Sequence, residues 1–237
     1  MSVAVLIPYR ATDHHRDRAL AHVTAWWRSL GYDPILGTCD GGPWVKACAV
    51  GNALARTDAD ILVVADADVL VPGIERAIAL VEQGAPWAVP HVKILRLTEW
   101  ATTQLYETGG HDGEMEKGCP YVGVVGGGMV ILRRDIYEDC PLDPRFALWG
   151  REDESWGLAL TVLHGEPQRL DGPLWHLWHP HPPRLNRRDP LRPESQELYL
   201  RYLRASRRAG RGLPDGREAM RTLVDQARHL TCAEAVA

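Results

Sequence analysis

The segment LVVADADVLV, residues 62–71, places two aspartates inside an apolar run. Its other positions are mostly leucine and valine, as is typical of a strand buried on both faces. Asp66 and Asp68 are two residues apart, so on extended backbone they project to the same side. Together they could hold a hard divalent cation such as Mg²⁺ or Mn²⁺, which prefers oxygen ligands. For an isolated pair, the commoner alternative is a turn in which each carboxylate accepts backbone N–H groups.

A second group of reactive side chains lies in LWGREDESW, residues 148–156. Acidic residues at the start of a helix are explained by capping and the helix dipole. That explanation leaves Trp149 and Gly150 without a role. An indole beside carboxylates can hold a sugar ring, because apolar C–H groups stack on the ring while hydroxyls bond the acids. A carboxylate such as Asp153 in a partly dry site is also a candidate general base.

A third group is WHLWHPH, residues 175–181, which contains three histidines. Isolated histidines are more often core or surface residues than metal ligands. Here three imidazoles follow an expected strand within a few residues. This grouping supports a metal or proton-transfer site and the core-or-surface alternative about equally.

The elements that must position these groups alternate along the first ~90 residues at the spacing of βαβ units. Expected strands are 3–9, 33–39, 60–68 and 87–95, and expected helices are 17–31, 45–59 and 73–84. This pattern predicts a mainly parallel sheet flanked by helices. In such sheets ligands bind at the carboxyl ends of the strands, where Asp66 and Asp68 stand.

The second half of the chain breaks this rhythm. Residues 105–120 are polar and glycine-rich, which favours a loop. A helix is expected over 153–165, and two amphipathic helices over 193–210 and 215–230. The later helices carry many arginines, which are best explained as a solvated helix face.

Composition limits the function. The chain has 237 residues, is 45% hydrophobic and carries a net charge of −4, so no global charge attracts nucleic acid or anionic lipid. Its five cysteines are odd in number and form no CxxC pair, which favours reduced thiols. No apolar run approaches the roughly 18 residues of a membrane span, and the amino-terminal run is too short for a signal peptide. We therefore expect a soluble, cytoplasmic protein.

Taken in order, four segments resemble the metal-dependent nucleotide-sugar glycosyltransferases of the GT-A fold. These are IPYR (7–10), DADVLV (66–71), GGGMVILRRDIY (126–137) and FALWGREDES (146–155). The nearest resemblance is to the β-1,4-galactosyltransferases, the polypeptide N-acetylgalactosaminyltransferases and the bacterial chondroitin polymerases, over about residues 3–182. It implies an α/β GT-A domain with a mixed, mainly parallel sheet and a hexosyl- or hexosaminyltransferase activity.

The resemblance also implies a role for individual residues. The donor nucleotide and its sugar would lie against Pro8, Tyr9, Arg10, Asp40, Asp66, Gly127 and Gly128. Mn²⁺ or Mg²⁺ would be held by Asp68 and a histidine, His176 by position with His179 as the alternate. Asp153 matches the catalytic base of the inverting relatives. The acceptor or donor sugar would contact Trp149, Gly150 and Glu152.

The resemblance ends at about residue 182, and a break in the sequence pattern near 183–192 suggests a division of the chain there. The GT-A domain would span 1–183, with a nucleotide-sugar half at 1–90 and an acceptor half at 91–183, and a helical extension would follow at 184–237. UDP is the favoured nucleotide. The acceptor stays open between a glycan, a small molecule, a protein and modified nucleic acid. Arg151 departs from the family pattern, because many relatives carry a second glycine there.

Three other function classes compete with this interpretation. A nucleotidyltransferase can use a similar sheet, but PYRATDHHRD after the first strand lacks the glycines of a phosphate loop. A non-catalytic protein that binds sugar nucleotides or glycans would fit the nine tryptophans. A metal-dependent hydrolase built on the histidines would leave Asp66, Asp68 and the WGRED segment without roles.

Overall fold

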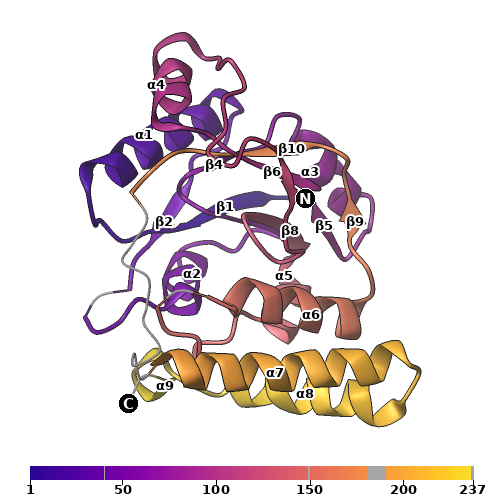
Figure 1. Cartoon of the computed structure of the whole chain (residues 1–237). Coiled ribbons are helices and arrows are strands. Elements are labelled where there is room, and N and C mark those ends of the chain that lie inside the picture. Colours follow the sequence, from indigo (N-terminus) through magenta and orange to yellow (C-terminus); the bar gives the residue numbers. More distant parts are fainter. Residues whose placement is uncertain (40, 149, 181–190, 236–237) are drawn as a thin grey trace.

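The structure is a computed structural model that describes residues 1–39, 41–148, 150–180 and 191–235 (Figure 1). Its strands are Val3–Pro8 (β1), Ile35–Gly37 (β2), Ile61–Ala65 (β3), Val69–Leu70 (β4), Trp87–Val89 (β5), Lys93–Arg96 (β6), Tyr121–Val122 (β7), Met129–Arg133 (β8), Gln168–Arg169 (β9) and Pro173–His176 (β10). Its helices are His14–Ser29 (α1), Lys46–Leu54 (α2), Glu75–Glu82 (α3), Glu99–Thr108 (α4), Arg134–Asp139 (α5), Glu152–His164 (α6), Leu191–Gly210 (α7), Pro214–Arg228 (α8) and Cys232–Ala235 (α9).

The main sheet has the strand order β2-β1-β3-β8-β5-β9. β1 pairs in parallel with β2 and β3, and β5 pairs in parallel with β9. β8 runs antiparallel between β3 and β5. Every residue of β3 is buried, because helices cover both faces of the sheet. The predicted mixed, mainly parallel sheet is confirmed.

Alternate residues of the central strands face two different layers. Leu62 and Val64 of β3 point toward α2 and α6, while Val63 points toward α1 and α3. Figure 1 shows the sheet between these layers, with the α7–α8 hairpin lying beyond α6. The period of two along β3 thus fixes which helices close which face.

A second, smaller sheet has the order β4-β10-β6-β7. β10 pairs antiparallel with β4 and parallel with β6, and β7 forms its edge. β4 follows Asp68 directly, so the two aspartates lie between β3 and β4 and not inside one continuous strand. The chain therefore passes from the first sheet to the second at the position of the aspartates.

The carboxyl-terminal helices α7 and α8 belong to the same hydrophobic cluster as the main sheet. Leu198 and Tyr202 of α7 and Met220 of α8 are buried in that cluster. The predicted division at 183 and 184 falls within 181–190, outside the described residues, and the domain boundaries stay a prediction.

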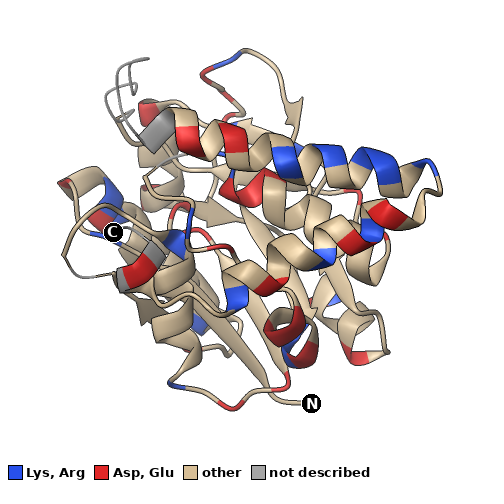
Figure 2. Cartoon of the chain, turned by 90° about the horizontal axis from the view of Figure 1, so that it is seen from below, with Lys and Arg blue, Asp and Glu red and all other residues tan. Residues whose placement is uncertain are grey.

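The arginines of α7 lie on its exposed side, as expected for a solvated helix face. Figure 2 shows acidic residues toward the start of this helix and basic residues toward its end. This order suits the helix dipole. The exposed positions are Arg201, Arg204, Arg207 and Arg208.

Several sequence-based expectations are wrong. The strand expected over 60–68 ends at Ala65, and the one expected over 87–95 is divided between β5 of the main sheet and β6 of the second sheet. Cys48 of α2 and Cys232 of α9 form a disulfide, with Cα atoms 5.8 Å apart across a separation of 184 residues. Their pairing depends on how α9 packs, which cysteine spacing cannot reveal; Cys39, Cys119 and Cys140 are free. The expected loop at 105–120 begins late, because α4 continues to Thr108 and ends at the left-handed Gly109.

Among the described helices, none has the length and apolar character needed to cross a membrane.

His91 gives the fold a predictable response to acid. Its side chain is fully buried, and neither ring nitrogen has a hydrogen-bond partner among the described residues. Burial, with the nearby charge of Arg169, lowers the pKa of His91 to about 4. Between about pH 6.5 and 4 the unfolded chain binds a proton there that the folded chain does not. The free energy of unfolding should therefore fall as the pH drops through this window, by up to about 3 kcal/mol from this group.

Urea unfolding at pH 7 and pH 4.5 tests this. We expect His91→Leu to lose less stability between the two pH values than the wild type. The exposed His229→Leu is the control and should follow the wild type. An identical pH dependence of His91→Leu and the wild type would contradict the assignment.

Candidate functional site

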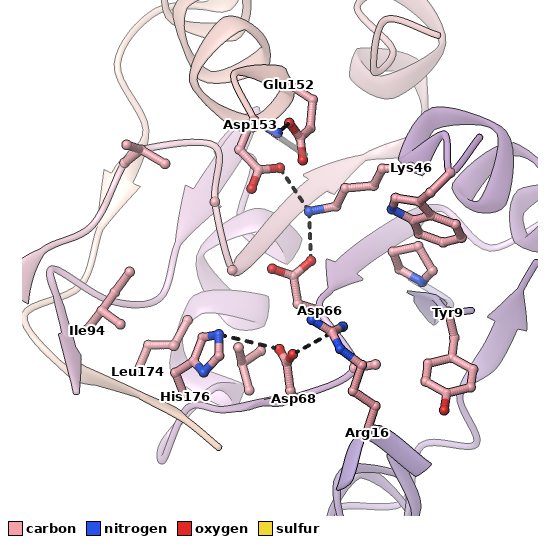
Figure 3. Close-up of a pocket in the computed structure, with 18 of the residues that line it drawn as sticks. Tyr9, Arg16, Lys46, Asp66, Asp68, Ile94, Glu152, Asp153, Leu174 and His176 are labelled. Atoms are coloured by element: carbon pink, nitrogen blue, oxygen red, sulfur yellow. Dashed lines mark hydrogen bonds and ion pairs between the residues drawn. The ribbon is translucent and has the colours of Figure 1, made fainter. Parts of the chain in front are cut away.

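A cavity of about 650 Å³ opens where several strands end. Pro8 ends β1, and Tyr9 and Arg10 follow it. Asp66 to Asp68 follow β3, and Gly127 and Gly128 precede the antiparallel β8. The first turn of α6 closes the cavity from above in Figure 3. Parallel strands bring their carboxyl ends to one edge, which is why residues far apart in sequence meet here.

Asp68, His176 and His179 form one cluster. One side-chain atom from each lies within 4.8 Å of the others. His179 Nε2 is 3.2 Å and His176 Nε2 is 3.9 Å from the Asp68 carboxylate. One carboxylate oxygen and two imidazole nitrogens suit Mn²⁺ or another first-row divalent ion. The sequence left His176 and His179 as alternatives, and the structure brings both to Asp68.

The charge around Asp68 favours its ionised form. The side chain is 7% exposed, and burial alone would raise its pKa. The two imidazoles and Arg16 outweigh burial and lower the pKa of Asp68. Arg16 Nη1 lies 3.8 Å from the Asp68 carboxylate (Figure 3). Sequence reasoning missed Arg16, although its place in the first turn of the helix after β1 was a usable signal.

Lys46, which sequence reasoning also missed, lies between two predicted site residues. Its ammonium nitrogen is 2.7 Å from Asp66 Oδ1 and 2.8 Å from Asp153 Oδ1 (Figure 3). Burial would lower the pKa of Lys46, but Asp153 and Asp66 outweigh it and the pKa is raised. Lys46 is the first residue of α2, whose start faces the cavity. It therefore links the Asp66 side of the cavity to α6 through two charge-assisted bonds.

Asp66 is held differently from Asp68. Burial, with the neighbouring Asp153 and Asp68 carboxylates, raises the pKa of Asp66 to about 6 despite the bond from Lys46. The two aspartates of the pair thus differ: Asp68 lies among imidazoles and a guanidinium, and Asp66 depends on one ammonium group.

Asp153 and Glu152 stand at the start of α6, as predicted. Their position depends on a close approach of two glycines. A side-chain carbon at Gly126 would lie 2.1 Å from the Asp153 carbonyl oxygen, and one at Gly157 would lie 2.7 Å from the Gly126 nitrogen. Only glycine permits this contact, which sets the first turn of α6 against the loop before β8.

Glu152 turns back toward the chain that precedes the helix. Its carboxylate accepts a hydrogen bond of 2.9 Å from the Gly150 N–H. Burial, with the adjacent Asp153 charge, raises the pKa of Glu152 to about 7. The group can therefore donate or accept a hydrogen bond near neutral pH, which suits contact with sugar hydroxyls.

The segment after β1 lines the other end of the cavity. The Tyr9 hydroxyl donates to the Asp17 carboxylate. Arg10 donates to the carbonyls of Cys39, at 2.6 Å, and Gly42, and its guanidinium lies over the Trp44 ring at 5.5 Å. These contacts hold the Tyr9 and Arg10 side chains in place as a polar wall of the cavity.

Two solved structures are similar to this chain in overall fold. A mutant β1,4-galactosyltransferase 7 from Drosophila, in complex with manganese, UDP-Gal and xylobiose, aligns over 80% of this chain and 79% of its own, with 14% identity and a TM-score of 0.51. GalNAc-T7, with UDP, GalNAc and Mn²⁺, aligns over 95% of this chain and 55% of its own, with 12% identity and a TM-score of 0.52. This chain has the GT-A fold.

The GT-A fold confirms the resemblance seen in the four sequence segments. No protein-family model matches the sequence. No curated protein matches it either. The similarity of this chain to known proteins is therefore found by comparing three-dimensional structures.

The predicted site residues of this GT-A chain come together, with named exceptions. The residues that line the cavity are Pro8, Tyr9, Arg10, Asp66, Asp68, Gly127, Gly128, Gly150, Glu152, Asp153 and His176. His179 contacts the carboxylate of Asp68, which lines the cavity. Asp40, Trp149 and His181 lie outside the described residues. The roles assigned to all of them stay predictions.

Proposed function

We propose that the protein is an inverting, divalent-metal-dependent glycosyltransferase. It would transfer a hexose or N-acetylhexosamine from a UDP-sugar to a hydroxyl acceptor. One observation carries the proposal. The Asp68–His176–His179 cluster and the Asp153 carboxylate lie at the same cavity of a GT-A fold. The two matched structures hold Mn²⁺ with UDP or UDP-Gal, which supports the choice of cofactor and nucleotide.

Residues at different places along the cavity would have different roles. Tyr9 and Arg10 would bind the uridine end of the donor. Asp68, His176 and His179 would hold Mn²⁺ or Mg²⁺, a Lewis acid that offsets the charge growing on the leaving diphosphate. Asp66 would contact the ribose, and the glycines before β8 would let the donor sugar approach the backbone closely.

Asp153 would act as the general base. It takes the proton of the acceptor hydroxyl as that oxygen forms a bond to the anomeric carbon. The bond from the anomeric carbon to the phosphate oxygen breaks, and its electron pair leaves with UDP. Attack opposite to the leaving group converts an α-linked donor into a β-linked product. Asp153 stands in the first turn of α6 and lines the cavity, where an acceptor hydroxyl could reach it.

Lys46 would position this base. With Oδ1 of Asp153 bonded to the ammonium group, Oδ2 remains to accept the proton. Lys46 also pairs with Asp66, so one side chain links the base on α6 to the proposed donor contact after β3. Correct placement of a reacting group is a large part of enzymatic rate enhancement.

Lys46→Met should lower kcat by about tenfold or more, because the base loses its fixed orientation. UDP and Mn²⁺ affinity should change much less, since Lys46 is assigned no contact with the nucleotide. Lys46→Arg, which keeps the charge, should recover part of the rate. Steady-state kinetics with calorimetry of UDP binding separates the two effects. Equal losses in kcat and UDP affinity, with no recovery by arginine, would argue for a merely structural lysine.

A donor panel tests the proposed function directly. UDP-glucose, UDP-galactose, UDP-N-acetylglucosamine and UDP-N-acetylgalactosamine are incubated with the protein and Mn²⁺, and UDP release is measured. We expect slow hydrolysis of at least one of them, lost in EDTA and restored by Mn²⁺. GDP-mannose is the comparison donor and should be inert. If the protein neither binds nor hydrolyses any UDP-sugar, the proposed function is wrong.

A further inference from the structure

One face of the second sheet forms a wall of the cavity and carries two rows of side chains. Ile94 of β6 lies beside Leu174 of β10 and Tyr121 of β7 in the strand register. These three make an apolar row. Two residues further along, Arg96 lies beside His176 and makes a polar row. Because residues two apart on a strand share a face, both rows point into the cavity, and all five residues line it.

The wall reaches from the metal-ligand cluster toward the proposed base. Figure 3 shows Leu174 and Ile94 beside His176, on the side away from Arg16. Val124 continues this side. Its Cγ2 would be 2.7 Å from a side-chain carbon at Gly127, and that carbon would be 3.4 Å from Asp153 Oδ2. A substrate lying on the apolar row therefore has the base at one end and Arg96 at the other.

Arg96 is the unusual member of the wall. Its Nε donates to the Tyr121 hydroxyl at 3.3 Å, and its Nη2 is 3.5 Å from His176 Nε2. Within the described parts of the chain, no carboxylate lies at ion-pair distance from it. By contrast, Arg16 faces Asp68, Lys46 faces two aspartates and Arg151 faces Glu154.

A half-buried guanidinium with a phenol and an imidazole for neighbours has N–H donors left over. Arginine presents five of them in a planar fork that matches a carboxylate or a phosphate. Such charge-assisted pairs are stronger than neutral hydrogen bonds. The position thus has the chemistry of an anion site whose counter-charge comes from a ligand.

We propose that Arg96 binds an anionic group, a phosphate or a carboxylate, on the acceptor, while the body of the acceptor lies on the Tyr121–Ile94–Leu174 row. The inference rests on the proposed function and narrows it to acidic acceptors. The order Asp68, His176, Arg96 across the sheet puts Arg96 on the far side of His176 from the Asp68 carboxylate. That order favours the acceptor over the donor diphosphate as the source of the anion.

Phenyl phosphate is a suitable probe, because its ring can cover the apolar row while its phosphate reaches Arg96. The protein is saturated with UDP and Mg²⁺, a diamagnetic ion, and phenyl phosphate binding is followed by ³¹P NMR titration. We expect Arg96→Gln to weaken this binding by about tenfold or more. Arg96→Lys should retain part of the affinity. Lys93→Gln, which removes a charge from the exposed face of the same strand, should bind like the wild type.

Calorimetry of UDP with Mg²⁺ on the same variants separates the two sources of the anion. We expect unchanged UDP affinity in Arg96→Gln. Weaker UDP binding with unchanged phenyl phosphate binding would assign Arg96 to the donor diphosphate and overturn the proposal. So would wild-type protein that does not bind phenyl phosphate. Wild-type protein that binds no UDP would instead overturn the proposed function, whatever the probe does.

Discussion

Asp153→Asn should lower kcat by about 10²–10⁴, the usual contribution of a general base. Asparagine keeps the size of the side chain and can still contact Lys46, but it cannot take the proton of the acceptor hydroxyl. The affinity for UDP and Mn²⁺ should be nearly unchanged, because Asp153 lies on α6, away from the Asp68–His176–His179 cluster. Steady-state kinetics and calorimetry of UDP binding measure the two quantities.

Glu166→Gln is the matched control, since it removes one exposed carboxylate just after the same helix. It should behave as the wild type does. The stereochemistry of the product gives an independent answer. ¹H NMR should show a β-linked product from an α-linked donor. An α-linked product would refute the inverting mechanism even if the variant were inactive.

The sequence predicted the parts of the fold that depend on local pattern. The apolar runs of β1 and β3 and the helical spacing of α1 were sufficient, because burial on both sheet faces leaves a clear signature. The short strands of the second sheet were not predicted in detail. β4 and β7 have two residues each, so their pairing is set by the neighbouring strands and not by their own composition.

In the candidate site, too, the residues with a strong local sequence signal were predicted and those that depend on packing were not. Asp66 and Asp68 were singled out because carboxylates inside an apolar run are unusual. Asp153 was singled out because it follows Trp149 and Gly150 and matches the base of the inverting relatives.

Lys46 and Arg16 were missed, although a basic residue in the first turn of a helix opposes the helix dipole and is itself a signal. Their importance comes from where α2 and α1 begin relative to β3, and only the packed structure brings those ends together.

Cys48 and His179 illustrate two further limits. The disulfide partner of Cys48 lies in the last helix, and no local spacing links the two positions. His176 was preferred by its position at the end of the expected strand, with His179 as the alternate. The chain leaves β10 after His176, which lets both imidazoles reach Asp68.

Asp68→Asn should abolish turnover and remove most of the affinity for Mn²⁺. Asp68 is the sole carboxylate of the described ligand cluster, and a neutral amide is a poor ligand beside two imidazoles. Without the ion, the charge that grows on the leaving diphosphate is not offset, a loss of several kcal/mol in the transition state. Mn²⁺ binding is measured by electron paramagnetic resonance, and turnover by UDP release.

The variant has to be folded for this result to carry meaning. Asparagine leaves Arg16, His176 and His179 without their shared carboxylate, so circular dichroism and the urea midpoint are measured alongside. His179→Ala, which keeps Asp68, should weaken Mn²⁺ binding without abolishing it. In the wild type, EDTA should stop turnover and excess Mn²⁺ should restore it. Full turnover in excess EDTA would eliminate the metal site as part of the reaction, because the Asp68–His176–His179 cluster would then have no ion to hold.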